Sequence, residues 1–144
     1  MDKSDKIIVG ISIGDLNGIG VEVILKTFQD NRMLDFCTPL IFASTKTISY
    51  HKKALNLEIP IHGITSLSQI QHTKINVLNI WKEDVSVTLG KASKESGDYA
   101  AKSLAIAVDY LKNKKIDVLV TAPINKETIQ SEDFNFPGHT EYLE

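Results

Sequence analysis

The chain has 144 residues, of which 42% are hydrophobic and 24% are charged, and its formal net charge at pH 7 is −2. These values are typical of one globular domain, and they exclude a disordered chain, a collagen-like repeat and a long coiled coil. They also exclude an overall basic field that would attract nucleic acid or an anionic membrane. We therefore expect no nucleic-acid or membrane partner, and any ligand must be recognised locally.

The first predicted unit is a strand, a glycine turn and a helix. Residues 7–13 form an almost continuous run of Ile and Val, which is typical of a parallel strand buried on both faces. The turn at 14–20 contains three glycines, and the polar residues 29–31 end the helical pattern that follows it. The apolar residues at helical spacing are Val21, Ile24, Leu25 and Phe28.

The cysteine usage and the N-terminal residues bear on the compartment. Cys37 has no partner for an intrachain disulfide, and its apolar surroundings indicate a buried thiol in a reducing compartment. A catalytic thiol is disfavoured, because no cationic neighbour along the sequence would lower its pKa. The polar residues 1–6 and the short apolar run after them match neither a signal peptide nor a membrane helix. The expected location is the cytoplasm.

A second strand and helix follow the first pair. Residues 40–43 are predicted to form a strand, and Ser44 is placed to cap a helix that runs to about residue 55. Residues 59–61 form a brief extended segment, and residues 76–80 alternate like a strand with one wetter face.

The second half begins with a polar segment and continues with a long helix. Residues 81–96 show no sustained period and are predicted to form a long loop of the kind that often carries function. Ser96 is the expected N-cap of the helix, and Lys112, Lys114 and Lys115 suit its negative C-terminal end. The apolar stripe comprises Ala100, Ala101, Leu104, Ala105, Ala107, Val108 and Leu111, and Lys102, Asp109 and Lys112 lie off it.

Residues 116–120 are predicted to form a further buried strand that leads into residues 121–126. This repeated alternation predicts an α/β fold, with a mostly parallel sheet flanked by helices. Residues 136–144 resemble a loop entering a helix, and the sequence ends within about one turn of it. We therefore expect a longer parent protein, with a flexible natural C-terminus as the alternative.

Ligands of parallel α/β sheets bind at the carboxyl ends of the strands, which directs attention to residues 14–22, 81–96, 121–126 and 136–141. The first loop is not a Walker loop, because it lacks the Gly-Lys-Ser/Thr ending, and it is not the dinucleotide fingerprint, because its glycine spacing differs. Its glycines would let backbone amides approach an anion at the start of a helix, or would only permit a tight turn. Asp15 is either a capping carboxylate or a residue of the site.

The later loops supply further polar side chains. Asn125 and Lys126 could line a polar pocket, but Asn125 as a helix cap and Lys126 as a solvated residue is an equal alternative. Next to the small Gly138, His139 and Thr140 offer an imidazole and a hydroxyl to an anionic or hydroxylated ligand. The remaining histidines lack the spacing of metal ligands and are interpreted as surface or structural residues; they are His51, His62 and His72.

Three motifs, in this order and at this separation, resemble the 4-hydroxythreonine-4-phosphate dehydrogenase family (PdxA) of pyridoxal phosphate biosynthesis. They are Gly14-Asp15-x-x-Gly18-Ile19-Gly20-x-Glu22, Val118-Leu119-Val120-Thr121-Ala122-Pro123-Ile124-Asn125-Lys126 and Phe136-Pro137-Gly138-His139-Thr140-Glu141. The first motif is similar to the glycine turn of isocitrate and isopropylmalate dehydrogenases, which share the fold. Leu16, Asn17 and Val21 depart from the proline, alanine and proline that are common in the family.

The resemblance implies an oxidation of 4-phosphooxy-L-threonine (4-hydroxythreonine 4-phosphate) by NAD or NADP, with decarboxylation, in vitamin B6 biosynthesis. It implies a divalent metal, such as zinc, magnesium or cobalt, which acts as a Lewis acid. His139 and Thr140 match the substrate-contacting pair of the family. Asp15, Asn125 and Lys126 are candidate pocket-lining residues. The metal-binding histidines, and most of the residues that bind phosphate and NAD, lie further along the chain in the family.

Residues 1–144 are therefore expected to be the first α/β lobe of a longer, two-lobed subunit with the isocitrate/isopropylmalate dehydrogenase-like fold. The resemblance implies a homodimer, and the 144 residues alone are expected to be inactive. Two other classes of function remain open. A phosphotransacetylase-like acyl transferase would transfer acyl groups to coenzyme A without reducing NAD. A non-catalytic binding module would hold a phosphorylated ligand without turnover.

Overall fold

The computed structural model describes residues 6–14, 16, 18–82 and 94–122. In this part of the chain five parallel strands form one sheet in the order β3-β4-β2-β1-β5. The strands are β1 (Ile7–Ser12), β2 (Cys37–Ala43), β3 (Ile61–Ile64), β4 (Ile75–Asn79) and β5 (Val118–Thr121). The α-helices are α1 (Gly20–Thr27), α2 (Thr45–Ala54) and α3 (Lys94–Lys112). Two short 3-10 helices, η2 (Asn31–Asp35) and η3 (Leu67–Gln69), lie in the connections.

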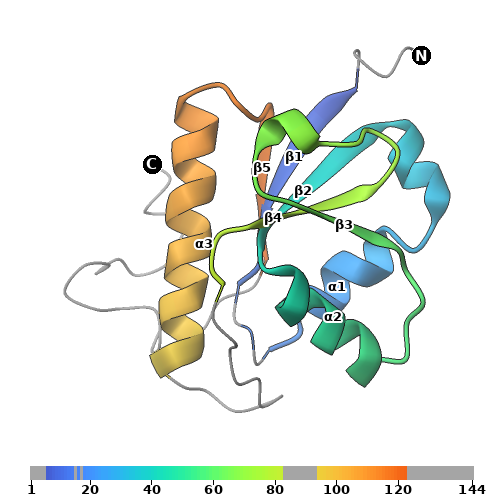
Figure 1. Cartoon of the computed structure of the whole chain (residues 1–144), viewed down its shortest axis with the longest axis vertical. Helices are drawn as coiled ribbons and strands as arrows, with labels where there is room; N and C mark the ends of the chain where they lie inside the picture. The colour runs from blue at the N-terminus through green and yellow to red at the C-terminus, as the bar shows by residue number, and fades with distance from the viewer. Residues whose placement is uncertain (1–5, 15, 17, 83–93, 123–144) are drawn as a thin grey trace.

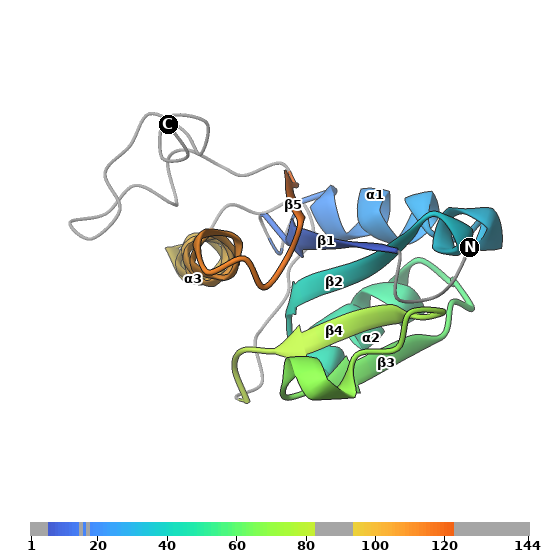
Figure 2. The same ribbon diagram turned by 90° about the horizontal axis from the view of Figure 1, so that it is seen from above.

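The sheet has helices on both faces. α1 and α2 lie side by side on one face, and α3 lies on the other (Figure 1). From above, β1 and β5 separate α3 from α1 (Figure 2). Side chains alternate between the two faces along a strand, so Ile41 packs with the α1 and α2 side chains and Phe42 packs with α3. The predicted α/β class with a parallel sheet is confirmed.

The first two helices agree with the sequence patterns. β1 is a central parallel strand as predicted, but only its second half is buried, and Ile7 is 46% exposed. The apolar residues expected to face the core from α1 are buried, namely Val21, Ile24, Leu25 and Phe28. The predicted cap of α2 is confirmed, because the Ser44 hydroxyl accepts a hydrogen bond from the Thr47 amide at 3.2 Å. No helix in the described part of the chain is long and apolar enough to cross a membrane.

β2 begins three residues earlier than predicted, at Cys37, and all seven of its residues are buried. The sequence did not predict this extension, because a proline such as Pro39 is usually found in edge strands or at the first residue of a strand. It is tolerated because the ladder with β4 starts only at the next residue, where Leu40 lies opposite Asn76. The missing amide of Pro39 therefore leaves no gap, and its carbonyl accepts a hydrogen bond from Asn76 Nδ2 at 3.2 Å.

β3 also differs from its prediction, because the strand begins at Ile61, where the predicted segment ended. Ile59 is buried but precedes the strand. Gly63 interrupted the apolar pattern, and in the structure it gives room to side chains of neighbouring elements. A Cβ at this position would meet the Thr45 hydroxyl and would lie 3.4 Å from Asn79 Nδ2.

Two predictions about α3 are wrong. Ser96 is a buried residue inside the helix and not its N-cap, because the helix already includes Lys94. Ala105 is exposed, so the apolar stripe is narrower than predicted. Alanine fits the apolar pattern of a helix, but its small side chain can be exposed to water at little cost in free energy. An alanine in the sequence therefore does not show which face of the helix it lies on.

The burial predicted for the last strand is wrong as well. β5 pairs only with β1 among the described residues, and its outward side chains Val118 and Val120 are 42% and 47% exposed. α1 covers β1 and leaves an apolar groove of about 310 Å³ beside β5. This groove is lined by Val9, Val23, Phe28, Met33 and Val120, among others.

Side-chain hydrogen bonds close the amino edge of the sheet, where the strands begin. Lys6 Nζ donates to the carbonyls of Leu34 and His72 at 2.6 and 2.9 Å. The Thr38 hydroxyl lies 2.8 Å from His72 Nδ1. Asn76 is fully buried and donates from Nδ2 to the carbonyls of Pro39, Gln71 and Lys74. These contacts join the starts of β1, β2 and β4.

Candidate functional site

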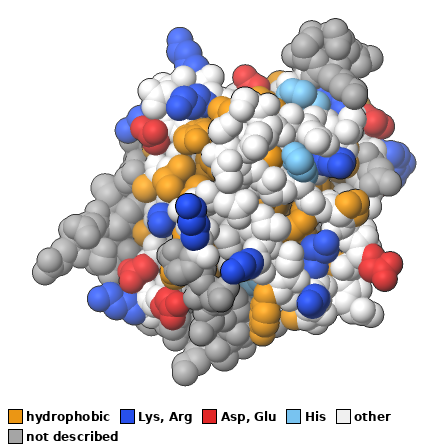
Figure 3. Space-filling view, viewed as in Figure 1, with side chains coloured by type: hydrophobic (Ala, Val, Ile, Leu, Met, Phe, Trp, Pro, Cys, Tyr) orange, Lys and Arg blue, Asp and Glu red, His pale blue; other side chains and the backbone are white. Residues whose placement is uncertain are grey.

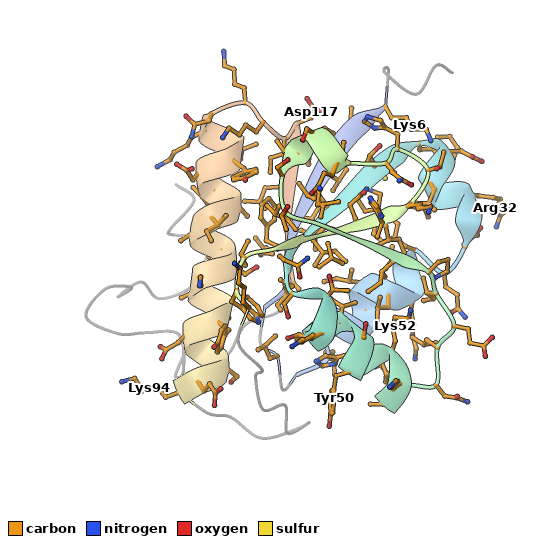
Figure 4. The ribbon with its side chains drawn as sticks, viewed as in Figure 1. Lys6, Arg32, Tyr50, Lys52, Lys94 and Asp117 are labelled. Atoms are coloured by element: carbon orange, nitrogen blue, oxygen red, sulfur yellow. The ribbon has the colours of Figure 1, made fainter. Side chains whose placement is uncertain are left out.

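The carboxyl ends of four strands meet at one edge of the sheet. The Ala122 amide donates to Ser12 at 3.1 Å, and the Ile80 amide donates to Ala43 at 2.8 Å, so the strand pairing continues to the ends of β1, β2, β4 and β5. This edge lies near Lys94, whereas Lys6 and Asp117 mark the opposite end of the molecule (Figure 4). On the face that Figure 3 shows, Lys and Arg side chains are scattered and do not gather into one basic patch.

The boundary between β1 and β5 is the point where the strand order reverses. From β1 the chain passes through α1 to β2 on one side, and it later returns through α3 to place β5 on the other side of β1. In open parallel sheets the ligand crevice forms at the carboxyl ends on either side of such a reversal. The glycine turn that follows β1 lies at this position.

The turn itself has the geometry that its glycines suggest. Gly14 has φ of 72°, a backbone conformation that residues other than glycine rarely adopt. Leu16 is fully buried and anchors the turn in the core, whereas Ile19, at the start of α1, is 63% exposed. The N-cap residue Ile19 carries no polar group for the first turn of α1, whose positive end faces the carboxyl edge. The tight turn weighed from the sequence is therefore confirmed, and the approach of an anion to the start of α1 stays a prediction.

Ser103, a polar residue of α3, reaches this edge. The Ser103 hydroxyl accepts a hydrogen bond from the Ile13 amide at 3.0 Å and donates one to the Phe42 carbonyl at 2.6 Å. It thus links the ends of β1 and β2 from the opposite face of the sheet.

Asn79 holds the neighbouring elements in place. Its Oδ1 accepts a hydrogen bond from the Thr45 amide at 2.7 Å and another from the Thr45 hydroxyl at 3.0 Å. Its Nδ2 donates to the Ile64 carbonyl at 3.2 Å. One amide side chain therefore supplies hydrogen-bond partners both to the first turn of α2 and to the end of β3.

Two buried nitrogens have no hydrogen-bond partner among the described residues, and both belong to residues that lie against this end of the core. They are Trp81 Nε1 and His51 Nε2. The Trp81 ring packs on Tyr99, with ring centroids 4.6 Å apart. Burial lowers the pKa of His51, and a hydrogen bond with the Leu16 backbone opposes that shift. Burial therefore favours the neutral form of this imidazole, which lies beside Leu16, the anchor of the glycine turn.

The site residues predicted from sequence all lie outside the described residues. They are Asp15, Asn125, Lys126, His139 and Thr140. The described chain reaches both neighbours of Asp15, and it ends at Ala122, which is buried at the carboxyl end of β5. The structure therefore describes the strands that lead to two of the predicted loops, without placing the five side chains themselves.

The predictions for the other reactive side chains can be compared with their surroundings. Cys37 is buried as expected, and desolvation raises the pKa of its thiol, opposed by the charge of Lys6. His62 contacts the Gln69 carbonyl at 3.1 Å, and His51 and His72 are structural, as interpreted from the sequence. Within the described ranges no three His, Cys, Asp or Glu side chains converge to hold a metal ion.

Sequence reasoning missed Ser103 and Asn79. A signal for Ser103 existed, because it lies three residues after Ala100 and four before Ala107, on the apolar face of a helix. A hydroxyl on such a face needs a buried partner. Asn79 ends a strand just after an apolar run, where an amide side chain often replaces missing backbone partners.

Comparison with known proteins relates this chain to one family. The family model of the pyridoxal phosphate biosynthetic protein PdxA matches residues 35–144. A 4-hydroxythreonine-4-phosphate dehydrogenase of Bacteroides thetaiotaomicron is 46% identical over 142 residues, which are 99% of this chain and 39% of the relative. A D-threonate 4-phosphate dehydrogenase of Cupriavidus necator is 30% identical over 138 residues, which are 94% of this chain and 41% of the relative.

A solved structure supports the same assignment. The crystal structure of a 4-hydroxythreonine-4-phosphate dehydrogenase from Burkholderia phymatum superposes with a TM-score of 0.87 at 28% identity. The match covers 96% of this chain and 42% of that one. The chain thus spans about two fifths of the length of the relatives that it matches. Because the family model covers most of its length, the chain belongs to the PdxA family.

Proposed function

We propose that the protein carrying this chain oxidises the secondary alcohol of 4-hydroxythreonine 4-phosphate with NAD or NADP, in the biosynthesis of pyridoxal phosphate. The observation that carries this proposal is the 46% identity, over nearly the whole chain, to a relative named for that dehydrogenase. The left-handed glycine turn at the β1/β5 boundary supports it, because this is the position where α/β sheets bind phosphorylated ligands.

Several residues of the chain receive roles in this proposal. His139 and Thr140 contact the substrate, as the resemblance of the motif at 138–141 implies. Asp15, Asn125 and Lys126 line the pocket at the ends of β1 and β5. The nicotinamide cofactor supplies the hydride acceptor when it is bound. The described residues do not form the metal site that the resemblance implies, so we assign its ligands to other parts of the protein and no step to the metal.

The proposal extends to the organisation of the protein. Residues 1–144 are the first lobe of a longer two-lobed subunit, and the subunits form a homodimer in the cytoplasm. The alignment supports a longer subunit, because it covers 99% of this chain and only 39% of the relative. The 144 residues by themselves are expected to lack dehydrogenase activity.

The direct test is an assay of the whole protein with 4-hydroxy-L-threonine 4-phosphate, NAD and a divalent metal, in which NADH formation is measured by absorbance. We expect metal-dependent NADH formation with the whole protein and none with residues 1–144. His139→Ala should weaken substrate binding by about 1.5–3 kcal/mol, the usual contribution of a hydrogen bond to a charged group. His62→Ala, on an exposed contact of β3, is the matched control and should leave binding unchanged.

Other outcomes would point to other functions. Acyl transfer to coenzyme A without NADH would favour the acyl-transferase alternative, and ligand binding without turnover by the whole protein would favour a binding module. A preference for D-threonate 4-phosphate is a specific second candidate, because a relative named for that substrate is 30% identical. The two phosphorylated acids should be compared at equal concentration. The higher identity to the first relative predicts the larger kcat/KM for 4-hydroxythreonine 4-phosphate.

A further inference from the structure

A hydroxyl group from α3 is inserted into the β-sheet where β1 and β2 end. The Ile13 amide donates to Ser103 Oγ, and Ser103 Oγ donates in turn to the Phe42 carbonyl. The distances are 3.0 and 2.6 Å, and Ser103 is completely buried. The hydroxyl therefore makes both hydrogen bonds away from water.

The register of the sheet shows what this hydroxyl replaces. Ser12 lies opposite Phe42, and the Ser12 carbonyl points to β5, where it accepts from Ala122. Because successive backbone groups of a strand point to opposite sides, the Ile13 amide points to β2. Ala43 directs its carbonyl to β4, so by the same alternation the Phe42 carbonyl points to β1. In an uninterrupted parallel ladder the Ile13 amide would donate directly to the Phe42 carbonyl.

Ser103 thus takes the place of one hydrogen bond between the strands, and the two backbones are held one hydroxyl apart at their carboxyl ends. Ile13 is followed by Gly14, which turns the chain with φ of 72°. The buried Leu16 then anchors the turn on the other face of the sheet. The direction in which the glycine turn leaves β1 is therefore fixed between a hydroxyl from α3 and an apolar anchor on the α1 and α2 side.

We propose that Ser103 is a positioning residue for the glycine turn at the ligand-binding edge. Its hydrogen bonds with the described residues are to backbone groups only, so we assign it an effect through the turn and no contact with substrate. Its effect on catalysis rests on the proposed function, whereas its effect on the turn does not.

The test uses the whole protein and three variants. Ser103→Ala removes the hydroxyl and keeps the helix, and Ser103→Thr keeps the hydroxyl. Thr38→Val is the matched control, because it removes another fully buried hydroxyl of the same sheet, at the amino edge. Amide hydrogen exchange is followed by mass spectrometry on peptides that cover residues 11–20 and 36–42. The kcat and KM of NAD-dependent oxidation are measured in parallel.

We expect Ser103→Ala to raise the exchange rate of peptide 11–20 by on the order of tenfold, because the Ile13 amide loses its acceptor. Ser103→Thr should restore the rate, and Thr38→Val should change only peptide 36–42. In the assay Ser103→Ala should lower kcat/KM by on the order of tenfold or more, mainly through KM, because the turn is displaced. Ser103→Thr should recover most of that loss.

The proposal is overturned if Ser103→Ala leaves peptide 11–20 unchanged, or if it raises exchange equally in both peptides. Equal effects of Ser103→Ala and Ser103→Thr on peptide 11–20 would also contradict it, because side-chain volume would then matter and the hydroxyl would not. A wild-type protein that does not oxidise 4-hydroxythreonine 4-phosphate would refute the proposed function, and the exchange measurements would still decide the role of Ser103.

Discussion

The backbone groups at the two edges of the same sheet are hydrogen-bonded in different ways. At the amino edge, Lys6 and Asn76 donate to backbone carbonyls of neighbouring strands and loops, and Asp117 accepts from the Ile8 amide at 2.8 Å. At the carboxyl edge, the Ser103 hydroxyl separates two strands, and Gly14 adopts a left-handed conformation. Lys6 and Asp117 lie far from Lys94 in Figure 4, which displays the two ends.

The two edges of this sheet therefore differ in role: the amino edge stabilises the fold, and the carboxyl edge positions the glycine turn. Side chains that bind directly across strand starts pair the backbone groups there and lower the free energy of the folded state. At the strand ends, a hydroxyl pairs the last backbone groups of β1 and β2, and the glycine turn that follows brings the uncapped start of α1 to this edge, where an anion could bind. Changes at the amino edge should therefore affect stability, and changes at the carboxyl edge should affect the position of the turn.

The largest expected effect is at the amino edge. Asn76→Ala should lower the free energy of unfolding by about 3 kcal/mol, because one buried and three partly buried hydrogen bonds to backbone groups are lost. Urea denaturation followed by circular dichroism measures the change. Asn113→Ala removes a single exposed hydrogen bond to the Asp109 carbonyl and is the control, with an expected loss below about 0.5 kcal/mol. Equal losses in the two variants would contradict the closed amino edge.

A substitution in the middle of β1 should have the next largest effect. A Cβ at Gly10 would overlap the end of the Ile116 side chain and lie 3.0 Å from the Phe42 ring, so Gly10→Ala should cost about 2 kcal/mol of stability. Ile116→Val removes the overlapping methyl group, and the double variant should recover part of the loss. Thermal unfolding of both single variants and of the double variant gives the coupling. Additive losses would show that the close approach of Ile116 to β1 does not limit this position.

The smallest of the three effects concerns His51, which lies against the anchor of the glycine turn. Burial lowers the pKa of His51 below its ordinary value of 6.5, so the unfolded chain binds this proton more readily than the folded chain. Stability from this group is complete above about pH 6.5 and is lost as the pH falls from there through the lower pKa of the folded state. Stability measured between pH 5 and 8 should therefore decline on the acid side.

His51→Gln should flatten this part of the pH profile, because glutamine does not titrate. His62→Gln alters an imidazole on the surface of β3 and should leave the acid-side decline in place. A profile that keeps its full slope in His51→Gln would assign the decline to other groups.

Much of this fold could be predicted from the sequence, because its central elements bury continuous apolar runs. β1 was predictable for that reason, α1 from the helical spacing of its apolar residues, and the Ser44 cap from a serine that follows a predicted strand. The start of β2 was not, because whether Pro39 fits depends on where the ladder with β4 begins. The exposure of Val118 and Val120 was not predictable either, since an apolar run does not reveal which elements cover it.

The candidate site was predictable only in part. The turn at Gly14 and its place at a carboxyl edge follow from the spacing of glycines after an apolar strand. The role of Ser103 does not, because it depends on the register of two strands and on the face that a distant helix presents. The predicted side chains of His139 and Thr140 lie outside the described residues, so their roles remain predictions.

Ligand binding at the carboxyl edge is tested most directly by hydrogen exchange of the whole protein with and without NAD and 4-hydroxythreonine 4-phosphate. We predict slower exchange in peptides at the carboxyl edge, which cover residues 12–20, 43–47 and 79–82, and no change at the amino edge around Lys6 and Asn76. Protection that is confined to the amino edge, or spread evenly over both edges, would contradict the claim that this sheet binds its ligand at the carboxyl ends of its strands.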